Sequence, residues 1–288
     1  MRRFADHNPM AVTAYFLAAA TVAMLRMDPV VIALTLAGAL TTFGLLCGFT
    51  EARSHLVSLG LFAVMALANP LLSHNGATVL FVMNHNPVTL EALLYGAAAA
   101  AMVIAVTYLF RAYSRVMTSD RLLYVFGGLS PKMALVLSMA LRYVPLFGRQ
   151  ARQVRQAQTA LGLYKEDNAI DSLRGEARIF SVMTTWALET GVITADSMTA
   201  RGYGTGRRTQ FSIFRWTRRD TALLLASLLL AAAALWGARD FAWYPRIASA
   251  PLTLRTAAGY AACGLLMFIP LIHRGKEAIR WRCLMCGM

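Results

Sequence analysis

The residue pattern with the most chemical content is an arginine between two small residues, Ala200-Arg201-Gly202. Glycine directly after a predicted last helical turn is a C-cap signal, so Arg201 should stand at the tip of a helix. Small neighbours let another protein surface close on the guanidinium, whose planar fork suits a carboxylate partner. An arginine here could equally serve only to neutralise the helix C-terminus, and the residues alone do not separate these two interpretations.

A second arginine stands inside an apolar stretch, Leu141-Arg142-Tyr143-Val144-Pro145. If Arg142 lies at membrane depth, we expect it either to serve a function or to form an ion pair. The alternative is that Arg142 lies at the membrane interface and extends its guanidinium toward water.

Motifs for catalysis or metal binding are missing from the sequence. It contains no G-x-x-x-x-G-K-[ST] phosphate loop, no H-E-x-x-H zinc motif and no legible Ser/His/Asp arrangement. His74 and His85 share one loop, where solvated histidines are favoured over a metal site. Cys283 and Cys286 form a single C-x-x-C, which favours two reduced thiols, with palmitoylation as the alternative. The sequence therefore predicts no active site, no metal site and no cofactor.

The amino-acid composition indicates that the chain that carries Arg142 and Arg201 is a membrane protein. Hydrophobic residues make up 58% of the 288 residues and charged residues 15%, and the mean hydropathy is +0.52. Soluble domains average about 25% charged residues, and a soluble core this apolar would leave too few polar side chains to cover its surface. Disorder is excluded because it requires low hydrophobicity. Nucleic-acid binding is not expected either, because no soluble module interleaves aromatic and basic residues.

Six apolar stretches approach the roughly 20 residues that a spanning helix needs. Small residues four positions apart, Gly44 with Gly48 and Gly96 with Ala100, predict close helix packing. The predicted fold is an all-α polytopic membrane protein with about six transmembrane helices and a long amphipathic helical cytoplasmic region. The predicted spans are Met10–Leu25, Val30–Phe49, Leu56–Leu72, Ala92–Phe110, Thr221–Gly237 and Thr256–Ile272.

The basic residues predict the orientation. Of the 28 Lys and Arg residues, 24 fall in segments that are cytoplasmic if the N-terminus is inside, and four fall outside. This asymmetry follows the positive-inside rule and places both termini in the cytoplasm. We therefore expect N-terminal transmembrane helices over 1–110, a cytoplasmic-facing region over 111–219, and C-terminal helices with a basic tail over 220–288.

The cytoplasmic region is not a polar tail. A helix should begin at Pro131, carry an apolar stripe through Phe147 and Val154, and end near Gly162. A second helical pattern over Ile179–Met198 then leads to Arg201. Two amphipathic helices are therefore expected to position the candidate arginines.

The residues of this region resemble the transmembrane T component of energy-coupling factor (ECF) transporters, a branch of ATP-binding-cassette (ABC) importers. The resemblance implies a scaffold that links two cytosolic ABC ATPase subunits to one small membrane S protein. The assembly would import a vitamin or metal ion across a bacterial or archaeal inner membrane. The matching elements are Leu141-Arg142-Tyr143-Val144-Pro145, Ala157-Gln158-Thr159-Ala160-Leu161-Gly162 and Met198-Thr199-Ala200-Arg201-Gly202-Tyr203, followed by Arg208-Thr209.

The resemblance also implies two ATPase-docking triplets. Ala200-Arg201-Gly202 matches the second triplet, and Ala160-Leu161-Gly162 matches the first, with Leu161 where the family usually has arginine. Leu161 could pack into an apolar groove, or Arg155 or Lys165 could supply the missing charge. The supporting residues implied are Arg142, Pro145, Arg149, Gln158, Tyr203 and Arg208.

Two other functions remain open at the level of sequence. One is a conventional permease with its own substrate pathway, and the other is a membrane-embedded enzyme that uses Arg142. The dearth of charged residues in the predicted spans argues against both, because substrate pathways usually expose intramembrane ionisable groups.

Overall fold

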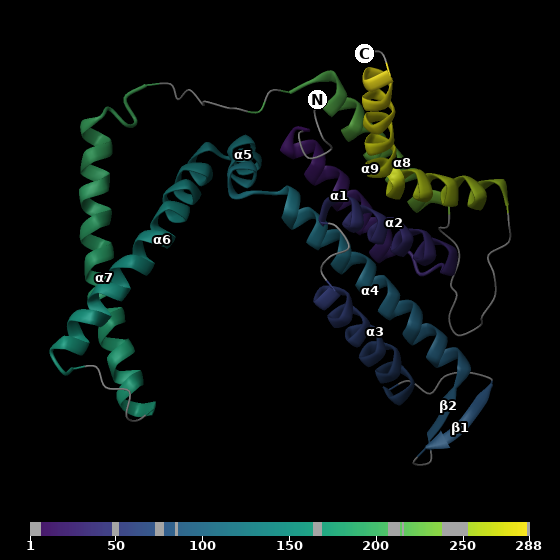
Figure 1. Ribbon diagram of the computed structural model, residues 1–288, viewed down its shortest axis with the longest axis horizontal. Helices are drawn as coiled ribbons and strands as arrows, with labels where there is room; N and C mark the ends of the chain where they lie inside the picture. Colours follow the sequence, from purple (N-terminus) through teal and green to yellow (C-terminus); the bar gives the residue numbers. More distant parts are fainter. Residues whose placement is uncertain are drawn as a thin grey trace. The chain divides into compact units, whose positions relative to one another are not determined.

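The structure is a computed structural model that describes residues 7–47, 52–72, 78–83, 86–163, 169–206, 214, 216–237 and 253–286. The described residues are mostly helical, as predicted for a helical membrane protein (Figure 1). The chain divides into two compact units, one comprising Met1–Arg121 with Phe214–Met288 and the other comprising Leu122–Ile213.

The first unit is a bundle of apolar helices. Four described helices are long and apolar enough to cross a membrane, and α1 and the His55–Asn69 part of α3 are shorter apolar segments. These six helices correspond to the six predicted spans, which identifies a multi-pass membrane protein. Their bounds are α1 Pro9–Leu25, α2 Pro29–Cys47, α3 Ala52–Leu72, α4 Leu90–Val116, α8 Arg218–Gly237 and α9 Leu254–Cys286.

Local polar residues explain where two of these helices begin. The Asn8 side chain accepts a hydrogen bond from the Met10 N–H at 3.0 Å, and Pro9 occupies the first turn of α1. Proline fits there because the first N–H groups of a helix have no intrahelical acceptor. Thr89 caps α4 in the same way by accepting from the Ala92 N–H.

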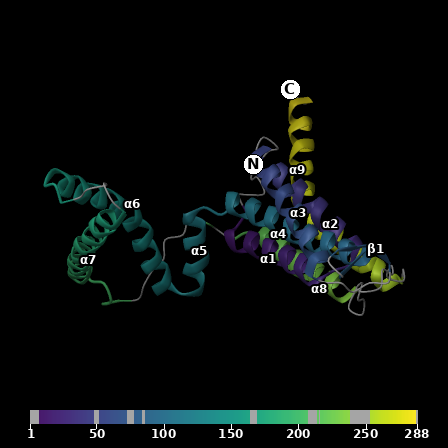
Figure 2. The ribbon, with the colours of Figure 1, turned by 90° about the horizontal axis from the view of Figure 1, so that it is seen from below.

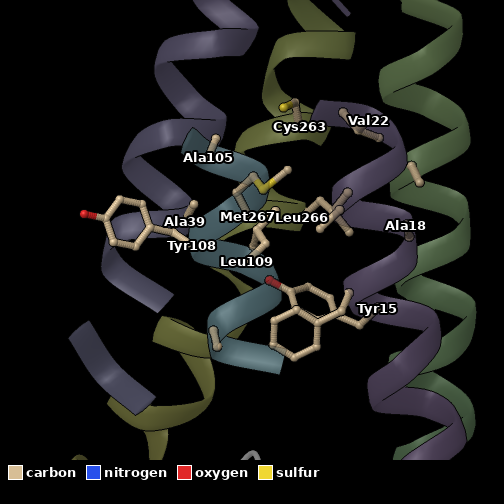
Figure 3. Close-up of a cluster of buried hydrophobic side chains, with 14 of the residues drawn as sticks. Tyr15, Ala18, Val22, Ala39, Ala105, Tyr108, Leu109, Cys263, Leu266 and Met267 are labelled. Carbon is tan, nitrogen blue, oxygen red and sulfur yellow. The ribbon is translucent and has the colours of Figure 1, made fainter. Parts of the chain in front are cut away.

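The core of the bundle lies between α1, α2, α4, α8 and α9. Tyr15, Leu109, Leu266 and Met267 are almost completely buried in it. Figure 3 shows side chains of α1, α2, α4 and α9 converging there, and Figure 2 shows α1 beside α4 and beside α8 from a second direction. The small residues Ala39 and Ala105 are fully buried in the same core.

Glycines bring two helix pairs close together. A Cβ atom added to Gly96 of α4 would lie 2.8 Å from the Ala66 carbonyl oxygen of α3. A Cβ atom added to Gly259 of α9 would lie 2.9 Å from the Cα of Gly237 in α8. The Gly96 contact agrees with the packing predicted from its spacing to Ala100, which is itself fully buried.

A buried polar cluster connects the N-terminal and C-terminal segments of the first unit. Asp220, which has no exposed surface, accepts a hydrogen bond from the Asn8 N–H at 3.2 Å, and its Oδ1 lies 2.7 Å from His7 Nδ1. The other carboxylate oxygen accepts from the Thr217 N–H and hydroxyl. The His7 ring also meets the His273 ring edge to face at 5.1 Å between centroids. The starts of α1 and α8 and the later part of α9 therefore meet at one end of the bundle.

Two parts of the first unit differ from the prediction. The region between α3 and α4, expected to be a loop, contains a β-hairpin of β1 (Val79–Met83) and β2 (Asn86–Thr89), which pair antiparallel. The last helix, α9, continues to Cys286 instead of giving way to a tail after Ile272. Figure 1 shows α9 changing direction along its length, and Pro270, which cannot donate a backbone hydrogen bond, accounts for the bend.

The second unit consists of helices that the sequence predicted only in part. Helix α6 (Pro131–Ala160) follows the predicted bounds, whereas α7 (Ala169–Ala200) begins ten residues before the expected Ile179. A short helix, α5 (Ser119–Leu129), was not predicted. None of α5, α6 and α7 is among the described helices that are long and apolar enough to span a membrane.

Candidate functional site

The helices α6 and α7, which carry the candidate site, run in opposite directions and cross each other at an angle (Figure 1). The Tyr143 hydroxyl lies 2.7 Å from the Thr194 hydroxyl, and the Phe147 ring packs edge-on against Trp186 at 5.4 Å. Toward the other end of the pair, Arg155 forms an ion pair with Glu176. The C-terminal end of α6 therefore lies beside the first half of α7, and the C-terminal end of α7 lies beside the first half of α6.

Helix α7 ends at the triplet that contains the candidate arginine. Gly202 has a φ of 80°, a left-handed conformation that favours glycine. The Gly202 N–H donates to the Thr199 carbonyl at 2.9 Å, and the Tyr203 N–H donates to the Met198 carbonyl at 3.0 Å. This is the Schellman pattern of helix termination. Arg201 immediately precedes the left-handed residue and its side chain is exposed, as the sequence predicted.

Helix α6 ends in the same way. Gly162 has a φ of 69° and its N–H donates to the Thr159 carbonyl at 3.0 Å. The Leu163 N–H donates to the Gln158 carbonyl at 2.9 Å. Leu161 precedes the left-handed glycine and is 72% exposed, so a large apolar side chain projects from the tip of α6.

The two helix ends are far apart. Because α6 and α7 are antiparallel, Leu161 and Arg201 lie toward opposite ends of the pair. Helix α7 has 32 residues and is therefore about 48 Å long. A single groove on one partner could not hold both tips, so the geometry suits two separate docking contacts.

Arg142 and Arg201 line the same groove between α6 and α7. This groove has a volume of about 460 Å³, and the neighbouring Met139, Ile193 and Met198 give it apolar walls. Both arginines are exposed, and none of the described residues that line the groove is acidic. The groove therefore offers two guanidinium groups beside apolar surface, which suits an anionic side chain of another protein.

The Arg142 side chain lies beside an aromatic ring. Its guanidinium carbon lies 5.4 Å from the centre of the neighbouring Tyr143 ring. The hydrogen bond with Thr194, and secondly Arg142, lower the pKa of the Tyr143 phenol below its ordinary value. Helix α6 is not among the described helices that are long and apolar enough to span a membrane. The two interpretations of Arg142, an intramembrane ion pair and extension toward water at the interface, stay predictions.

The other predicted supporting residues are dispersed. Pro145 lies inside α6 and, like Arg149, is exposed. Gln158 is 7% exposed, and its side-chain carbonyl oxygen has no hydrogen-bond donor among the described residues. Tyr203 takes part in the α7 cap through its N–H and is 45% exposed. Arg208 lies outside the described residues.

Of the two basic residues proposed to compensate for Leu161, the structure describes only Arg155. Arg155 already pairs with Glu176 across the helix pair. Lys165 lies outside the described residues, as do His74 and His85 of the predicted loop. The side chains of Cys283 and Cys286 are likewise not described.

The helix pair exposes many large apolar side chains. Phe180 and Leu173 of α7 are 73% and 72% exposed, and Val144 and Val136 of α6 are 67% and 62% exposed. Large contiguous apolar surface on a protein marks a site of contact with another protein or with lipid. Of the apolar stripe predicted on α6, Phe147 packs against Trp186 of α7, whereas Val144 is exposed.

Three contacts of the site were not predicted from the sequence. These are the Tyr143–Thr194 hydrogen bond, the Arg155–Glu176 ion pair and the groove shared by Arg142 and Arg201. Each depends on how two helices cross, which spacing within one helix does not reveal. The sequence Thr-Ala-x-Gly occurs directly before both Leu163 and Tyr203, and this repeat could have predicted that α6 and α7 end in the same way.

Comparison with known proteins supports the resemblance to T components over part of the chain. The protein named "Energy-coupling factor transporter transmembrane protein EcfT" of Listeria innocua serovar 6a is 29% identical over 36% of this chain and 40% of its own. The protein of the same name from Lacticaseibacillus paracasei is 34% identical over 34% of this chain and 40% of its own. No protein-family model matches the chain. The chain is thus EcfT-like over a segment that spans about two fifths of these curated relatives.

Proposed function

We propose that this protein is the transmembrane coupling subunit of an ECF-type importer. It would hold two cytosolic ABC ATPase subunits and one small membrane S protein, and it would bind neither ATP nor the transported vitamin or metal ion itself. The observation that carries the proposal is the pair of matching helix ends on α6 and α7, which lie toward opposite ends of one helix pair.

The two tips would contact the two ATPases. At the α7 tip, Arg201 would reach a carboxylate in a groove of one ATPase, and Arg142 would contribute a second guanidinium to the same acidic partner. At the α6 tip, Leu161 would enter an apolar part of the corresponding groove on the other ATPase. The EcfT-like segment supports this assignment because its relatives are named as the transmembrane protein of an ECF transporter.

The mechanism would be mechanical. When ATP closes the two ATPases, the distance between their grooves changes, and the tips of α6 and α7 move with them. Tyr143 with Thr194 and Phe147 with Trp186 connect the helices near their middle, so a movement at the tips would change the crossing of the whole pair. The exposed apolar side chains along α6 and α7 would carry this change to the S protein.

The proposed topology follows the charge asymmetry of the sequence. Both termini and the region 111–219 would face the cytoplasm, between membrane helices over 1–110 and 220–288. The ends of α1 and α8 that meet at His7 and Asp220 would then both lie at the cytoplasmic face. This arrangement gives the ATPases access to the α6–α7 pair.

The test is purification of the full chain from its host in mild detergent, with identification of the proteins that accompany it. Arg201→Glu should weaken ATPase capture about 30-fold or more, because removing one partner of a buried charge pair costs about 2–5 kcal/mol. Arg201→Lys should lose less, since it keeps the charge but not the planar fork. The matched control is Arg174→Glu, a charge reversal on the same helix at an arginine that is 75% exposed.

Capture of an ATPase pair and a small hydrophobic protein by the unaltered chain, lost with Arg201→Glu and kept with Arg174→Glu, would support the proposal. A chain that purifies without ATPases, or an Arg201→Glu variant that still drives uptake normally, would refute the docking role.

A further inference from the structure

A groove on the first unit has the form of a lipid site. It has a volume of about 620 Å³ and lies along α4, with Met24 of α1 and Phe43 of α2 contributing to its walls. Met24 and Phe110 are 59% and 52% exposed, so the groove is on the outside of the bundle. Because it follows helices that can cross a membrane, its natural surroundings are lipid.

The groove occupies one face of α4. Its lining positions recur every three or four residues from Met102 to Arg115. The opposite face, which includes Ala105, Tyr108 and Ala112, is buried in the core. Residues three and four apart share a side of a helix, so the groove is a continuous strip rather than a set of isolated dimples.

The chemistry of the strip changes along its length. Met102, Val103 and Val106 form its apolar part, whereas Arg111, Ser114 and Arg115 lie in the last two turns of the helix. Arg111 and Arg115 are one turn apart, which places their Cβ atoms about 5–6 Å from each other. None of the described residues that line the groove is acidic.

The dimensions match one leaflet of a bilayer. The rise along α4 from Met102 to Arg111 is about 14 Å at 1.5 Å per residue. The hydrocarbon layer of one leaflet is about 15 Å thick, half of the 30 Å core. An acyl chain that lay along the apolar part would therefore bring its headgroup to the level of the two arginines.

We propose that this groove binds an anionic phospholipid. The phosphate would lie between Arg111 and Arg115 and accept their N–H groups, and the Ser114 hydroxyl would donate to the same phosphate or to the headgroup. One acyl chain would lie against Met102, Val103, Val106 and Phe110. Guanidinium groups suit phosphate because two parallel N–H groups can meet two phosphate oxygens, and basic pockets between membrane helices select acidic headgroups.

The occupant is a lipid rather than a soluble anion because the apolar strip and the arginines form one groove. A free phosphate would use only the arginines and leave the apolar part empty. A protein helix would cover the strip without any need for a positive end. This inference concerns the first unit alone and does not depend on the proposed function of α6 and α7.

The experiment is native mass spectrometry of the full chain extracted from nanodiscs that contain equal amounts of phosphatidylglycerol and phosphatidylcholine. The unaltered chain should retain one phosphatidylglycerol. The double variant Arg111→Gln with Arg115→Gln should retain at least tenfold less, while phosphatidylcholine retention stays low in both. The matched control, Arg218→Gln with Arg219→Gln, removes two exposed arginines at the start of α8 and should retain as much as the unaltered chain.

Two further measurements distinguish a bound lipid from free inorganic phosphate. Val106→Trp fills the apolar part without changing charge and should lower phosphatidylglycerol retention, whereas millimolar inorganic phosphate should not displace the lipid. The proposal is overturned if the Arg111/Arg115 variant retains the lipid fully, if Val106→Trp has no effect, or if inorganic phosphate alone empties the site. Loss of a co-purifying protein in Val106→Trp with unchanged lipid retention would identify a protein contact instead and would also overturn it.

Discussion

Leu161 and Arg201 occupy the same position in two copies of one helix-ending motif. Each follows an alanine that ends its helix and precedes a glycine with positive φ, and each cap has the same two backbone hydrogen bonds. The backbones therefore present the two side chains equivalently, although one is apolar and the other is cationic. Any difference in what the two tips bind must come from the side chains.

This equivalence predicts the effect of exchanging side chains at the α6 tip. Leu161→Arg should keep at least a third of the ATPase capture, because the cap already suits an arginine in α7. Leu161→Asp should lower capture tenfold or more, since an apolar groove would have to desolvate a carboxylate. Quantitative co-purification with the ATPases measures both. Equal capture by the two variants would show that the α6 tip is not at an interface.

A second prediction concerns the cap of α7. Gly202→Ala places a Cβ atom on a residue with a φ of 80°, which costs roughly 1–2 kcal/mol. The last turn of α7 should fray, and the amides of Gly202 and Tyr203 should exchange with solvent about fivefold faster or more. Gly206→Ala is the control, because Gly206 has no positive φ and open space around it. Hydrogen exchange measured by mass spectrometry should distinguish the variants, and equal protection in both would contradict the assigned role of the glycine.

A third prediction tests the close packing of α3 and α4. Alanine normally stabilises a helix relative to glycine by about 1 kcal/mol. At Gly96 the added methyl group would meet Ala66 and Asn69, and overpacking of this kind costs about 1–3 kcal/mol. We therefore expect Gly96→Ala to lower the thermal unfolding temperature in detergent, whereas Gly60→Ala, which meets nothing within 4 Å, should leave it unchanged or raise it. A stabilised Gly96→Ala protein would mean that the two helices are less tightly packed.

A fourth prediction concerns the buried carboxylate at the start of α8. Asp220→Ala would remove the acceptor of the Asn8 and Thr217 N–H groups and the partner of His7. Buried polar groups without partners cost about 1–3 kcal/mol each, so the first unit should lose at least that much stability. Asp171→Ala should change stability by less than about 1 kcal/mol, because the Asp171–Arg174 pair is exposed. Thermal unfolding of both variants provides the comparison, and similar losses would contradict the role given to the cluster.

The sequence predicted the apolar helices well because hydropathy is a local property. All six predicted spans correspond to helices, and the predicted starts differ by a few residues at most. The beginning of α7 was missed because Ser172–Arg178 is polar and includes Gly175, a pattern that resembles a linker. The hairpin was missed because the segment between α3 and α4 has no clear alternation of apolar and polar residues.

The candidate site was predictable in its parts and not in its assembly. The positions of Arg201 and Leu161 at helix ends were predicted because a glycine C-cap can be recognised in a sequence. That Arg142 shares a groove with Arg201 follows from the antiparallel crossing of α6 and α7, which no spacing within either helix specifies. The lipid groove was missed for a similar reason, since its walls come from three helices.

The contact between His7 and Asp220 can form only after most of the chain has been synthesised. The two residues are 213 positions apart, and the whole α6–α7 pair is encoded between them. At 5–20 residues per second, synthesis of that interval takes on the order of 10–40 s. Throughout this time the start of α1 is already made while its acidic partner is not. The contact that joins the starts of α1 and α8 can therefore form only after the whole α6–α7 pair has been synthesised.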